Sequence, residues 1–418
     1  MPNSLHERWQ KTVAAHPEAI ALTDASSGEI LTFSELEARA RRTLPHPFPG
    51  GNSVEFIAQT IAAWRVNIAI CPLEANCPEP EIADLPSGTA HIKTTSGSTG
   101  TPRLVLFDAD QLAADAANIV ATMQLTADRS NIGVISMAHS YGFSNLVLPL
   151  LLHGIPLIIC SDPLPGSFSR ALTFLPKTGG CVPAVPAMWR AWLNSGCLDV
   201  DRIRLAISAG APLTSELENR IFDEAGIKVH NFYGSSECGG IAYDGTDAPR
   251  SSPQAVGTPM SGVTTSLSSE GCLIVHSSAV GTTYWPAPET DVLGGSRFVT
   301  NDLAKVAPDG SITLRGRAGD RINIAGRKLD PSTIEAELAK HPSVTQCLVF
   351  GIASPDPERV QEIVAITDGG EEVALRAHLA KRLPSWQRIR HWWVNPSLKP
   401  NSRGKLSRSL WREKWLAR

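Results

Sequence analysis

Short apolar segments alternate with amphipathic segments along most of the chain, and this alternation restricts the folds open to it. Four segments have the length and composition of buried strands: 147–152 (VLPLLL), 155–160 (IPLIIC), 203–208 (IRLAIS) and 272–277 (CLIVHS). Residues 214–226 form a candidate helix, because Thr214 is a good N-cap residue and Gly226 suits a helix end. Strands that alternate with helices predict an α/β fold in which a large domain of parallel-rich sheets is packed with helices.

The pattern changes near residue 316, where a glycine-rich turn leads into a short strand and then a helix that begins at Asp330-Pro331. Gly316 and Gly319 would let the backbone swivel at this turn. About 100 residues remain, which is enough for one small α+β domain. We therefore expect a large domain over residues 1–316 and a small, mobile C-terminal domain over residues 317–418.

Charge and hydropathy exclude several classes of function. The chain of 418 residues has 38 Lys and Arg against 41 Asp and Glu, a net charge of −3, which argues against a nucleic-acid partner and gives no reason for attraction to anionic lipid. The longest apolar run, Val147–Cys160, is interrupted by proline, histidine and glycine and is too short for a membrane span. The first twenty residues lack the apolar core of a signal peptide, so we expect a cytoplasmic protein.

The eight cysteines are scattered and form no CxxC pair, so neither a disulfide framework nor a zinc site is indicated. Reduced and mostly buried thiols are expected instead.

The strongest local motif is TTSGSTGTPR, residues 94–103. Its backbone N–H and side-chain hydroxyl groups can converge on a phosphate, and Arg103 adds positive charge at its end. It is not a Walker loop, which requires GxxxxGK[ST]. From composition alone, a polar surface loop explains this segment equally well.

The order of residues in this motif resembles the phosphate loop of the acyl-adenylate-forming superfamily, which includes acyl-CoA synthetases, peptide-synthetase adenylation domains and luciferases. NFYGSSE (231–237) is similar to the YGxTE element, with Ser236 in place of Thr. The resemblance implies that an aromatic residue here stacks on adenine, that Ser236 meets the α-phosphate and that Glu237 holds Mg²⁺, which prefers hard oxygen ligands.

Further elements of the same superfamily follow in order. SAGAPL (208–213) is similar to the segment that lines the adenine pocket, and FVTND (298–302) resembles the TGD element, with Asp302 placed to bind both ribose hydroxyls. The resemblance implies that the following residues bind ATP: Thr95, Ser96, Gly97, Ser98, Thr99, Gly100, Arg103, Gly210, Ala211, Pro212, Asn231, Phe232, Tyr233, Gly234, Ser235, Asp302 and Arg317. It places the hinge between the domains at Gly319 and Asp320.

Near the C-terminus, residues 399–408 match the PxxxxGKxxR element. Lys405 would be the catalytic lysine, bridging the substrate carboxylate and the α-phosphate, with Glu237 and Ser236 completing the catalytic set. Alone, a lysine in a basic tail would be a solvated charge. Removing one preorganised donor of this kind typically lowers the rate about 10²- to 10³-fold.

The segment SMAHSYGFS (136–144) resembles the PxxHxxG segment of fatty- and aryl-acid ligases. His139, Tyr141 and Phe143 would then border the acyl pocket, although a helix start with satisfied side chains would look the same. No Asp lies between residues 136 and 145 to hold an α-ammonium group, so a plain carboxylic acid is favoured over an amino acid. A serine esterase with Ser140 as nucleophile stays open, but the first glycine of its motif is missing.

The resemblance implies ATP-dependent adenylation of a carboxylic acid, with Mg²⁺, followed by transfer to the thiol of CoA or of a phosphopantetheinyl carrier protein. The region before the phosphate loop looks shortened, which favours a carrier protein. Five tryptophans near the C-terminus would either dock a carrier or pack a core: Trp386, Trp392, Trp393, Trp411 and Trp415. A decayed, non-catalytic nucleotide-binding module is the alternative.

Overall fold

The computed structural model describes residues 4–418 except 75–76, 96–102, 326, 357–358 and 401–405, and it omits the side chains of Thr95 and Lys328. Its central feature is a run of six parallel strands. In spatial order they are β9 (Val229–Ser235), β8 (Ile203–Ser208), β7 (Gly180–Ala184), β5 (Ser130–Gly133), β6 (Leu157–Ile159) and β1 (Ile20–Asp24). A short antiparallel strand, β2 (Ile30–Thr32), ends the sheet at this side. The predicted α/β fold with a parallel-rich sheet is confirmed.

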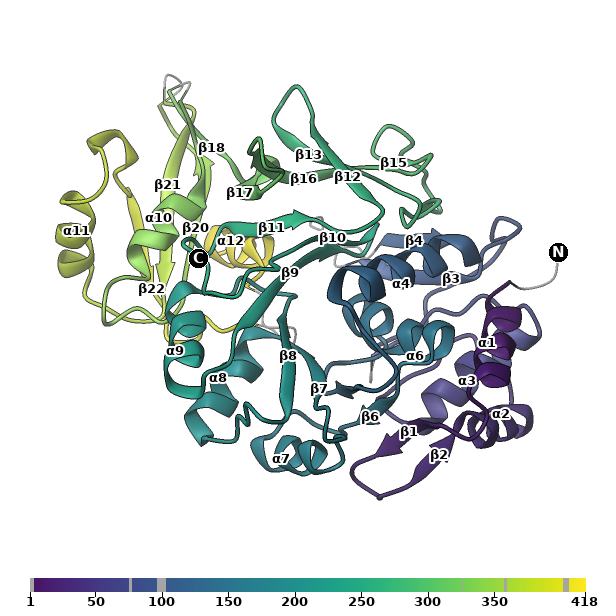
Figure 1. Ribbon diagram of the computed structural model, residues 1–418. Coiled ribbons are helices and arrows are strands. Elements are labelled where there is room, and N and C mark those ends of the chain that lie inside the picture. The colour runs from purple at the N-terminus through teal and green to yellow at the C-terminus, as the bar shows by residue number, and fades with distance from the viewer. Residues whose placement is uncertain (1–3, 75–76, 96–102, 326, 357–358, 401–405) are drawn as a thin grey trace.

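Helices cover both faces of the parallel strands, which explains why β5, β6 and β7 are buried along their whole length. One group contains α1 (Ser4–Ala15), α4 (Ala109–Met123) and α6 (Leu148–His153), and the other contains α7 (Pro165–Thr173), α8 (Pro186–Ser195) and α9 (Ser215–Ala225) (Figure 1). The chain runs from β5 through α6 to β6, whereas α7, α8 and α9 lead to β7, β8 and β9, which lie in the opposite direction along the sheet. Right-handed crossovers therefore place α6 on one face of the sheet and α7, α8 and α9 on the other. Near the N-terminus, α2 (Phe33–Arg42) and α3 (Val54–Arg65) pack against each other.

Local capping explains the start and end of α9. Thr214 Oγ1 accepts a hydrogen bond from the Leu217 amide at 3.3 Å, and Gly226 ends the helix with a φ of +68°. The predicted helix over 214–226 is therefore confirmed, as are the strands at 203–208 and, as β13 (Cys272–Ser277), at 272–277.

The prediction of a strand at 147–152 is wrong. This segment is helical: a π-helical turn, η1 (Phe143–Val147), runs directly into α6, which ends at Gly154. A continuous apolar run does not distinguish a buried strand from a buried helix, and here every residue of η1 is buried. Of the predicted strand at 155–160, residues 157–159 form β6.

Beyond β9 the sheet continues with antiparallel strands. They are, in spatial order, β10 (Gly239–Tyr243), β11 (Ala255–Pro259), β17 (Ile312–Arg317), β16 (Arg297–Val306), β13 and β12 (Val263–Leu267), with β15 (Leu293–Gly294) also paired to β16. A separate three-stranded sheet joins β3 (His91–Thr95), β4 (Arg103–Phe107) and β14 (Thr283–Trp285). These two sheets carry most of the predicted nucleotide-binding residues.

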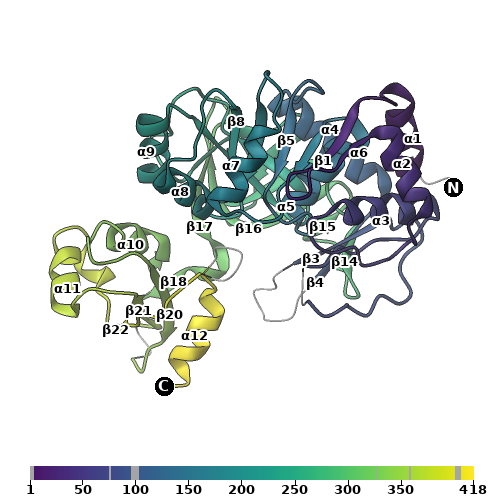
Figure 2. The same cartoon turned by 90° about the horizontal axis from the view of Figure 1, so that it is seen from below.

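The C-terminal residues form a smaller α+β unit beside β16 and β17 (Figure 2). Its strands are β18 (Ile322–Ile324), β19 (Arg327–Leu329), β20 (Cys347–Ala353), β21 (Gln361–Thr367) and β22 (His391–Val394), and its helices are α10 (Pro331–Leu338), α11 (Glu372–Ala380) and α12 (Arg408–Leu416). Its core clusters begin at Ile322, whereas the main cluster of the large domain ends at Ile312. The two parts therefore have separate hydrophobic cores, and the exact boundary at residue 316 stays a prediction.

The C-terminal tryptophans contribute to the packing of the small domain. Trp411 on α12 is 5% exposed, and Trp393 and Trp415 pack against it with ring centroids 5.6 Å apart for Trp393–Trp411 and 6.1 Å apart for Trp393–Trp415. Trp386 and Trp392 pack against the cluster on the other face of β20–β21–β22. These contacts support the core interpretation of the tryptophans over a docking patch.

All eight cysteines are free thiols, and five of them are buried, as the sequence predicts. Among the described residues, no helix combines the length and the apolar character needed to cross a membrane.

Candidate active site

Glu237 lies at the turn of the β9–β10 hairpin. Ser235 pairs with Gly239, so residues 236–238 form the turn, with Ser236 half-buried beside the carboxylate. The Ser235 hydroxyl donates a hydrogen bond to Glu237 Oε2 at 2.8 Å and accepts one from the Glu237 amide at 3.2 Å. A Cβ atom on Gly234 would lie 2.6 Å from the Gly239 carbonyl oxygen, so only glycine fits there. The hairpin therefore holds the carboxylate in one place.

A second carboxylate contact comes from a residue that the sequence did not single out. The Tyr284 hydroxyl, on β14, donates a hydrogen bond to Glu237 Oε1 at 3.2 Å. The guanidinium carbon of Arg103 lies 3.5 Å from the Tyr284 ring centroid, and Arg103 Nη2 lies 3.0 Å from Glu289 Oε1. Tyr284 thus links the predicted phosphate-binding arginine to the predicted metal-binding glutamate.

The predicted phosphate loop joins β3 to β4. Thr95 pairs with Arg103 in the antiparallel register, so residues 96–102 connect the two strands. Ser96, Gly97, Ser98, Thr99 and Gly100 lie outside the described residues, as does the side chain of Thr95, and their roles stay predictions. Arg103 at the end of this segment stands beside Tyr284, and therefore close to Glu237.

Asp302 and Arg317, the predicted ribose ligands, face each other on neighbouring strands. They are register partners in β16 and β17, and Arg317 Nε donates to Asp302 Oδ1 at 3.1 Å. The Tyr233 hydroxyl donates to the other oxygen, Oδ2, at 2.6 Å. The Asp302 carboxylate raises the pKa of Arg317, and burial together with Asp302 raises the pKa of Tyr233 well above its usual value. The phenol therefore stays a hydrogen-bond donor at neutral pH.

Gly210, Ala211 and Pro212 follow the carboxyl end of β8, where Gly210 has a φ of +80°. Asn231 on β9 is the register partner of Ser208, at the same end of the parallel sheet. Ligands of open α/β sheets bind at this end. The structure thus brings the two predicted adenine-side segments to the same end of the sheet.

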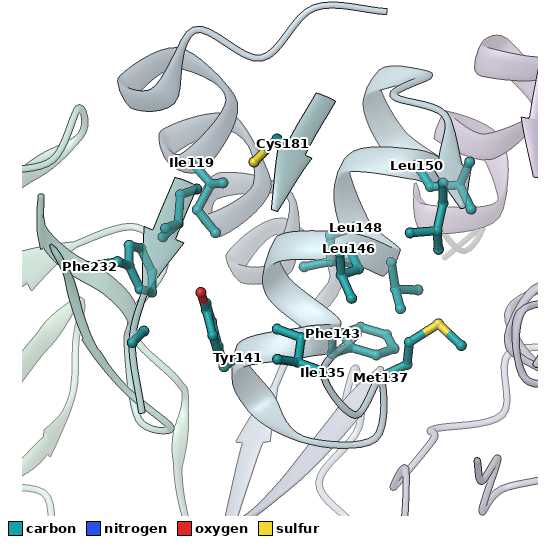
Figure 3. Close-up of a cluster of buried hydrophobic side chains, with 14 of the residues drawn as sticks. Ile119, Ile135, Met137, Tyr141, Phe143, Leu146, Leu148, Leu150, Cys181 and Phe232 are labelled. Atoms are coloured by element: carbon teal, nitrogen blue, oxygen red, sulfur yellow. The ribbon is translucent and has the colours of Figure 1, made fainter. Parts of the chain in front are cut away.

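The three predicted acyl-pocket residues occupy different surroundings, and Figure 3 shows two of them, Tyr141 and Phe143. Tyr141 stacks on Phe232, with centroids 5.7 Å apart and planes 20° apart, so it reaches the adenine-side hairpin. His139 caps the short helix α5 (Ser140–Gly142), and its Nδ1 accepts from the Tyr141 amide at 3.2 Å. Phe143 is fully buried, with its ring centroid 4.3 Å from that of His91, and is part of the hydrophobic core.

The predicted hinge forms a short 3-10 helix, η2 (Ala318–Asp320), directly after β17. Gly316 has a φ of +100°, whereas Gly319 is outside the positive-φ region, so only Gly316 needs glycine for its backbone conformation. Asp320 forms an ion pair with Arg408, whose Nη2 also lies 2.7 Å from Glu335 Oε1. This ion pair ties the hinge to the start of α12.

Lys405, the predicted catalytic lysine, lies outside the described residues. Arg408, three positions later in the same element, is well anchored: its Nε donates to the Val349 carbonyl oxygen at 2.8 Å. The end of the PxxxxGKxxR element is therefore fixed against β20 and the hinge, and the role of Lys405 stays a prediction.

The donor groups at this site have the chemistry that a nucleotide and a magnesium ion require. Glu237 supplies hard carboxylate oxygens of the kind that Mg²⁺ prefers, and Arg103 supplies a donor for phosphate oxygens. Asp302 supplies an acceptor for sugar hydroxyls.

Known families match both parts of the chain. Residues 84–285 match the AMP-binding enzyme family, and residues 333–405 match the AMP-binding enzyme C-terminal domain. The chain belongs to the acyl-adenylate-forming superfamily of AMP-binding enzymes. The first match contains Arg103 and Glu237, and the second contains Lys405, in the order that the sequence motifs predicted.

Individual members of the superfamily agree with this assignment. Feruloyl-CoA synthase from an Amycolatopsis species is 26% identical over 358 residues, covering 79% of this chain and 72% of the relative. Oxalate–CoA ligase from Arabidopsis thaliana is 26% identical over 356 residues, covering 79% of this chain and 68% of the relative. ATP-bound MatB from Rhodopseudomonas palustris superposes with a TM-score of 0.86 at 20% identity over 99% of both chains, which establishes the shared fold.

Proposed function

We propose that this protein is an ATP-dependent carboxylic acid:thiol ligase. In the first step a carboxylate oxygen of the acid attacks the α-phosphorus of ATP, forming an acyl-adenylate and releasing pyrophosphate. In the second step a thiol sulfur attacks the acyl carbonyl carbon, forming a thioester and releasing AMP and the thiol proton. The relatives named as CoA ligases and the ATP-bound structural neighbour support this proposal.

One observation carries the proposal: a single hairpin connects the predicted ribose-binding and phosphate-binding groups. Tyr233 on β9 contacts Asp302, the predicted ribose ligand, while Glu237 at the turn contacts Tyr284 beside Arg103. Tyr233 and Glu237 are four residues apart on this hairpin, so their Cα atoms lie at most about 14 Å apart, and the predicted ribose-binding and phosphate-binding groups are held at a fixed separation. This arrangement suits a nucleoside triphosphate whose ribose and phosphates are bound simultaneously.

In the first step, Arg103 and the segment 95–100 would orient the phosphates for in-line attack, and Glu237 would hold Mg²⁺ with Ser236 near the α-phosphate. Bound Mg²⁺ supplies the positive charge that stabilises the departing pyrophosphate. Lys405 would neutralise charge shared between the carboxylate and the α-phosphate. Asp302 and Arg317 would keep the ribose fixed while these bonds change.

For the second step, we propose that the small domain reorients about Gly319 and Asp320 and admits the thiol. The names of the relatives favour CoA as the thiol, and a phosphopantetheinyl carrier protein is the alternative. For the acid, the two relatives' names point to substrates of very different size, so we propose only a carboxylic acid without an α-ammonium group. His139 and Tyr141 would border its acyl chain.

The two other hypotheses receive less support. Residues 134–139 separate β5 from Ser140, so Ser140 is not on the strand-to-helix elbow that an esterase nucleophile requires. A decayed nucleotide-binding module would have no need for a positioned Glu237, yet two hydroxyl groups hold this carboxylate.

The test is pyrophosphate release with ATP and Mg²⁺ across a panel of aryl, fatty, dicarboxylic and amino acids, with wild type and Lys405→Ala side by side. We expect release with one class of acid and its loss in the variant, followed by thioester formation with CoA or a holo carrier protein. Nucleotide binding without release for any acid would instead establish the decayed module. Labelling by a serine-directed phosphonate without any need for ATP would establish the esterase.

A further inference from the structure

A buried group of polar side chains lies between two hairpins of the candidate site, β3–β4 and β9–β10. Lys93 lies on β3, two residues before the strand enters the phosphate-loop segment, Asp115 lies on α4, and Ser144 lies in η1. Their exposed fractions are 4%, 2% and 3%. Burial of charged groups at this depth is rare in proteins and costs free energy unless the groups are paired.

The contacts within this group run from one hairpin to the other. Lys93 Nζ lies 3.9 Å from Asp115 Oδ2 and 3.5 Å from Ser144 Oγ, and Ser144 Oγ donates to the same carboxylate oxygen at 2.6 Å. The other oxygen, Asp115 Oδ1, accepts a hydrogen bond from the Gly240 amide at 3.1 Å. Lys93 also lies 4.4 Å from the Phe107 ring centroid, on β4.

The Gly240 contact is made directly beside the turn that carries Glu237, at the start of β10. Gly239 has a φ of +69°, and a Cβ atom there would lie 2.1 Å from Asp115 Oδ1. The backbone at Gly239 therefore lies so close to the Asp115 carboxylate that only glycine fits at this position. Because Gly239 is the register partner of Ser235, any displacement of Asp115 moves the turn and its carboxylate.

We infer that Lys93 and Asp115 are positioning residues, which set the Glu237 turn in a fixed place relative to the strand that leads into the phosphate loop. Lys93 holds Asp115 from the β3 side, and Asp115 holds the β9–β10 hairpin through Gly240. The inference rests on the proposed function, in which Glu237 holds the magnesium ion that accompanies the phosphates. Among the described residues, no hydrogen bond or ion pair joins either side chain to a predicted nucleotide-binding residue.

A role in fold stability alone does not account for this pair. Replacing a buried ion pair by apolar side chains of similar volume is often neutral or stabilising, whereas removing one partner alone is strongly destabilising. The chain contains a natural control, because Lys228, whose side chain is 9% exposed, pairs with Glu218 and Asp244 at 2.5 and 2.7 Å, directly before β9 and away from the Glu237 turn. It resembles Lys93 as a paired lysine with little exposure but differs from it in position.

The test compares ATP affinity with Mg²⁺ and with EDTA by titration calorimetry, so that the ratio of the two dissociation constants reports how well the ion is held. The variants are Lys93→Met/Asp115→Asn, which keeps an oxygen acceptor for the Gly240 amide, and Lys93→Met/Asp115→Leu, which removes it. Both double variants leave no charge unpaired, so both should fold. Lys228→Met is the control, and the melting temperature of each protein is recorded.

We expect the Mg²⁺-dependent gain in ATP affinity to fall about tenfold in Lys93→Met/Asp115→Leu, which removes both contacts, and to fall less in Lys93→Met/Asp115→Asn, which loses the contact to Lys93 but keeps the acceptor for the Gly240 amide. Lys228→Met should lower the melting temperature without changing the ratio. An unchanged ratio in Lys93→Met/Asp115→Leu would overturn the inference. Wild-type protein that binds ATP equally well with Mg²⁺ and with EDTA would instead reject the proposed role of Glu237, and this inference with it.

Discussion

The Tyr233 hydroxyl donates a 2.6 Å hydrogen bond to Asp302, so the aromatic residue expected to stack on adenine also fixes the expected ribose ligand. Arg317 holds the other oxygen of the same carboxylate at 3.1 Å. Each carboxylate oxygen has a second lone pair, so a ribose hydroxyl can still donate to it. The expected adenine and ribose contacts are therefore connected through the side chain of Tyr233.

Tyr233→Phe should weaken ATP binding about tenfold, because a hydrogen bond to a charged group contributes roughly 1.5 to 3 kcal/mol. The phenyl ring keeps the stacking surface, so the loss isolates the effect on Asp302. Titration calorimetry with ATP measures it. Equal affinities for wild type and variant would show that Asp302 needs no support from Tyr233.

Tyr284→Phe removes the hydroxyl that donates to Glu237 Oε1 but keeps the ring beneath Arg103. We expect the Mg²⁺ concentration that gives half-maximal pyrophosphate release to change several-fold, while the melting temperature stays within a few degrees of wild type. A Mg²⁺ titration of the adenylation step provides the measurement. If the Mg²⁺ dependence of the variant matches that of wild type, the Tyr284–Glu237 contact has no part in holding the ion.

The two glycines at the domain junction should respond differently to alanine. A Cβ atom on Gly316 would lie 2.0 Å from the Asp330 carboxylate, which caps α10, and the backbone there has a φ of +100°. A Cβ atom on Gly319 would have no heavy atom within 4 Å. Gly316→Ala should therefore destabilise the small domain by about 1 to 3 kcal/mol, whereas Gly319→Ala should be nearly neutral.

Chemical denaturation followed by tryptophan fluorescence distinguishes these variants, since five tryptophans report on the small domain. Equal midpoints for Gly316→Ala and Gly319→Ala would contradict the prediction.

The free energy of unfolding should fall as the pH is lowered from about 6.5 to 5. His91 is buried against Phe143, and burial, together with Lys93, lowers the pKa of His91 well below its usual value. The unfolded chain takes up a proton in this range and the folded chain does not, so stability is fully present above about pH 6.5 and is lost on acidification. One such histidine contributes up to about 1.4 kcal/mol per pH unit.

Urea denaturation at pH 7, 6 and 5 measures this dependence. His91→Met should reduce the slope, whereas replacement of the exposed His276 by methionine should leave it unchanged. A slope in His91→Met as steep as that of wild type would show that other groups cause the acid sensitivity.

Local chemistry made several elements predictable from the sequence. Thr214 and Gly226 mark the ends of α9 because capping depends only on nearby residues. The strand at 203–208 is bounded by polar residues and a glycine turn, and the order of motifs gave the superfamily. The apolar run at 147–152 misled the prediction, because burial on all sides removes the periodicity that separates a strand from a helix.

The supporting residues of the site were not predictable in the same way. Tyr284, Lys93 and Asp115 belong to no motif that the sequence displays, and each acts through a residue far away along the chain. Their importance follows from tertiary contacts alone. Phe143 shows the converse: its motif suggested the acyl pocket, but its neighbours in the fold are those of a core side chain.

Arg317 is the last residue of β17, and both sheet neighbours of that strand, β16 and β11, belong to the large domain. Any rotation about the predicted hinge at Gly319 and Asp320 would therefore begin after Asp302 and Arg317, the predicted ribose ligands. The acyl-adenylate would then stay bound to the large domain while the small domain rotates. The two half-reactions could follow each other without release and rebinding of the adenylate.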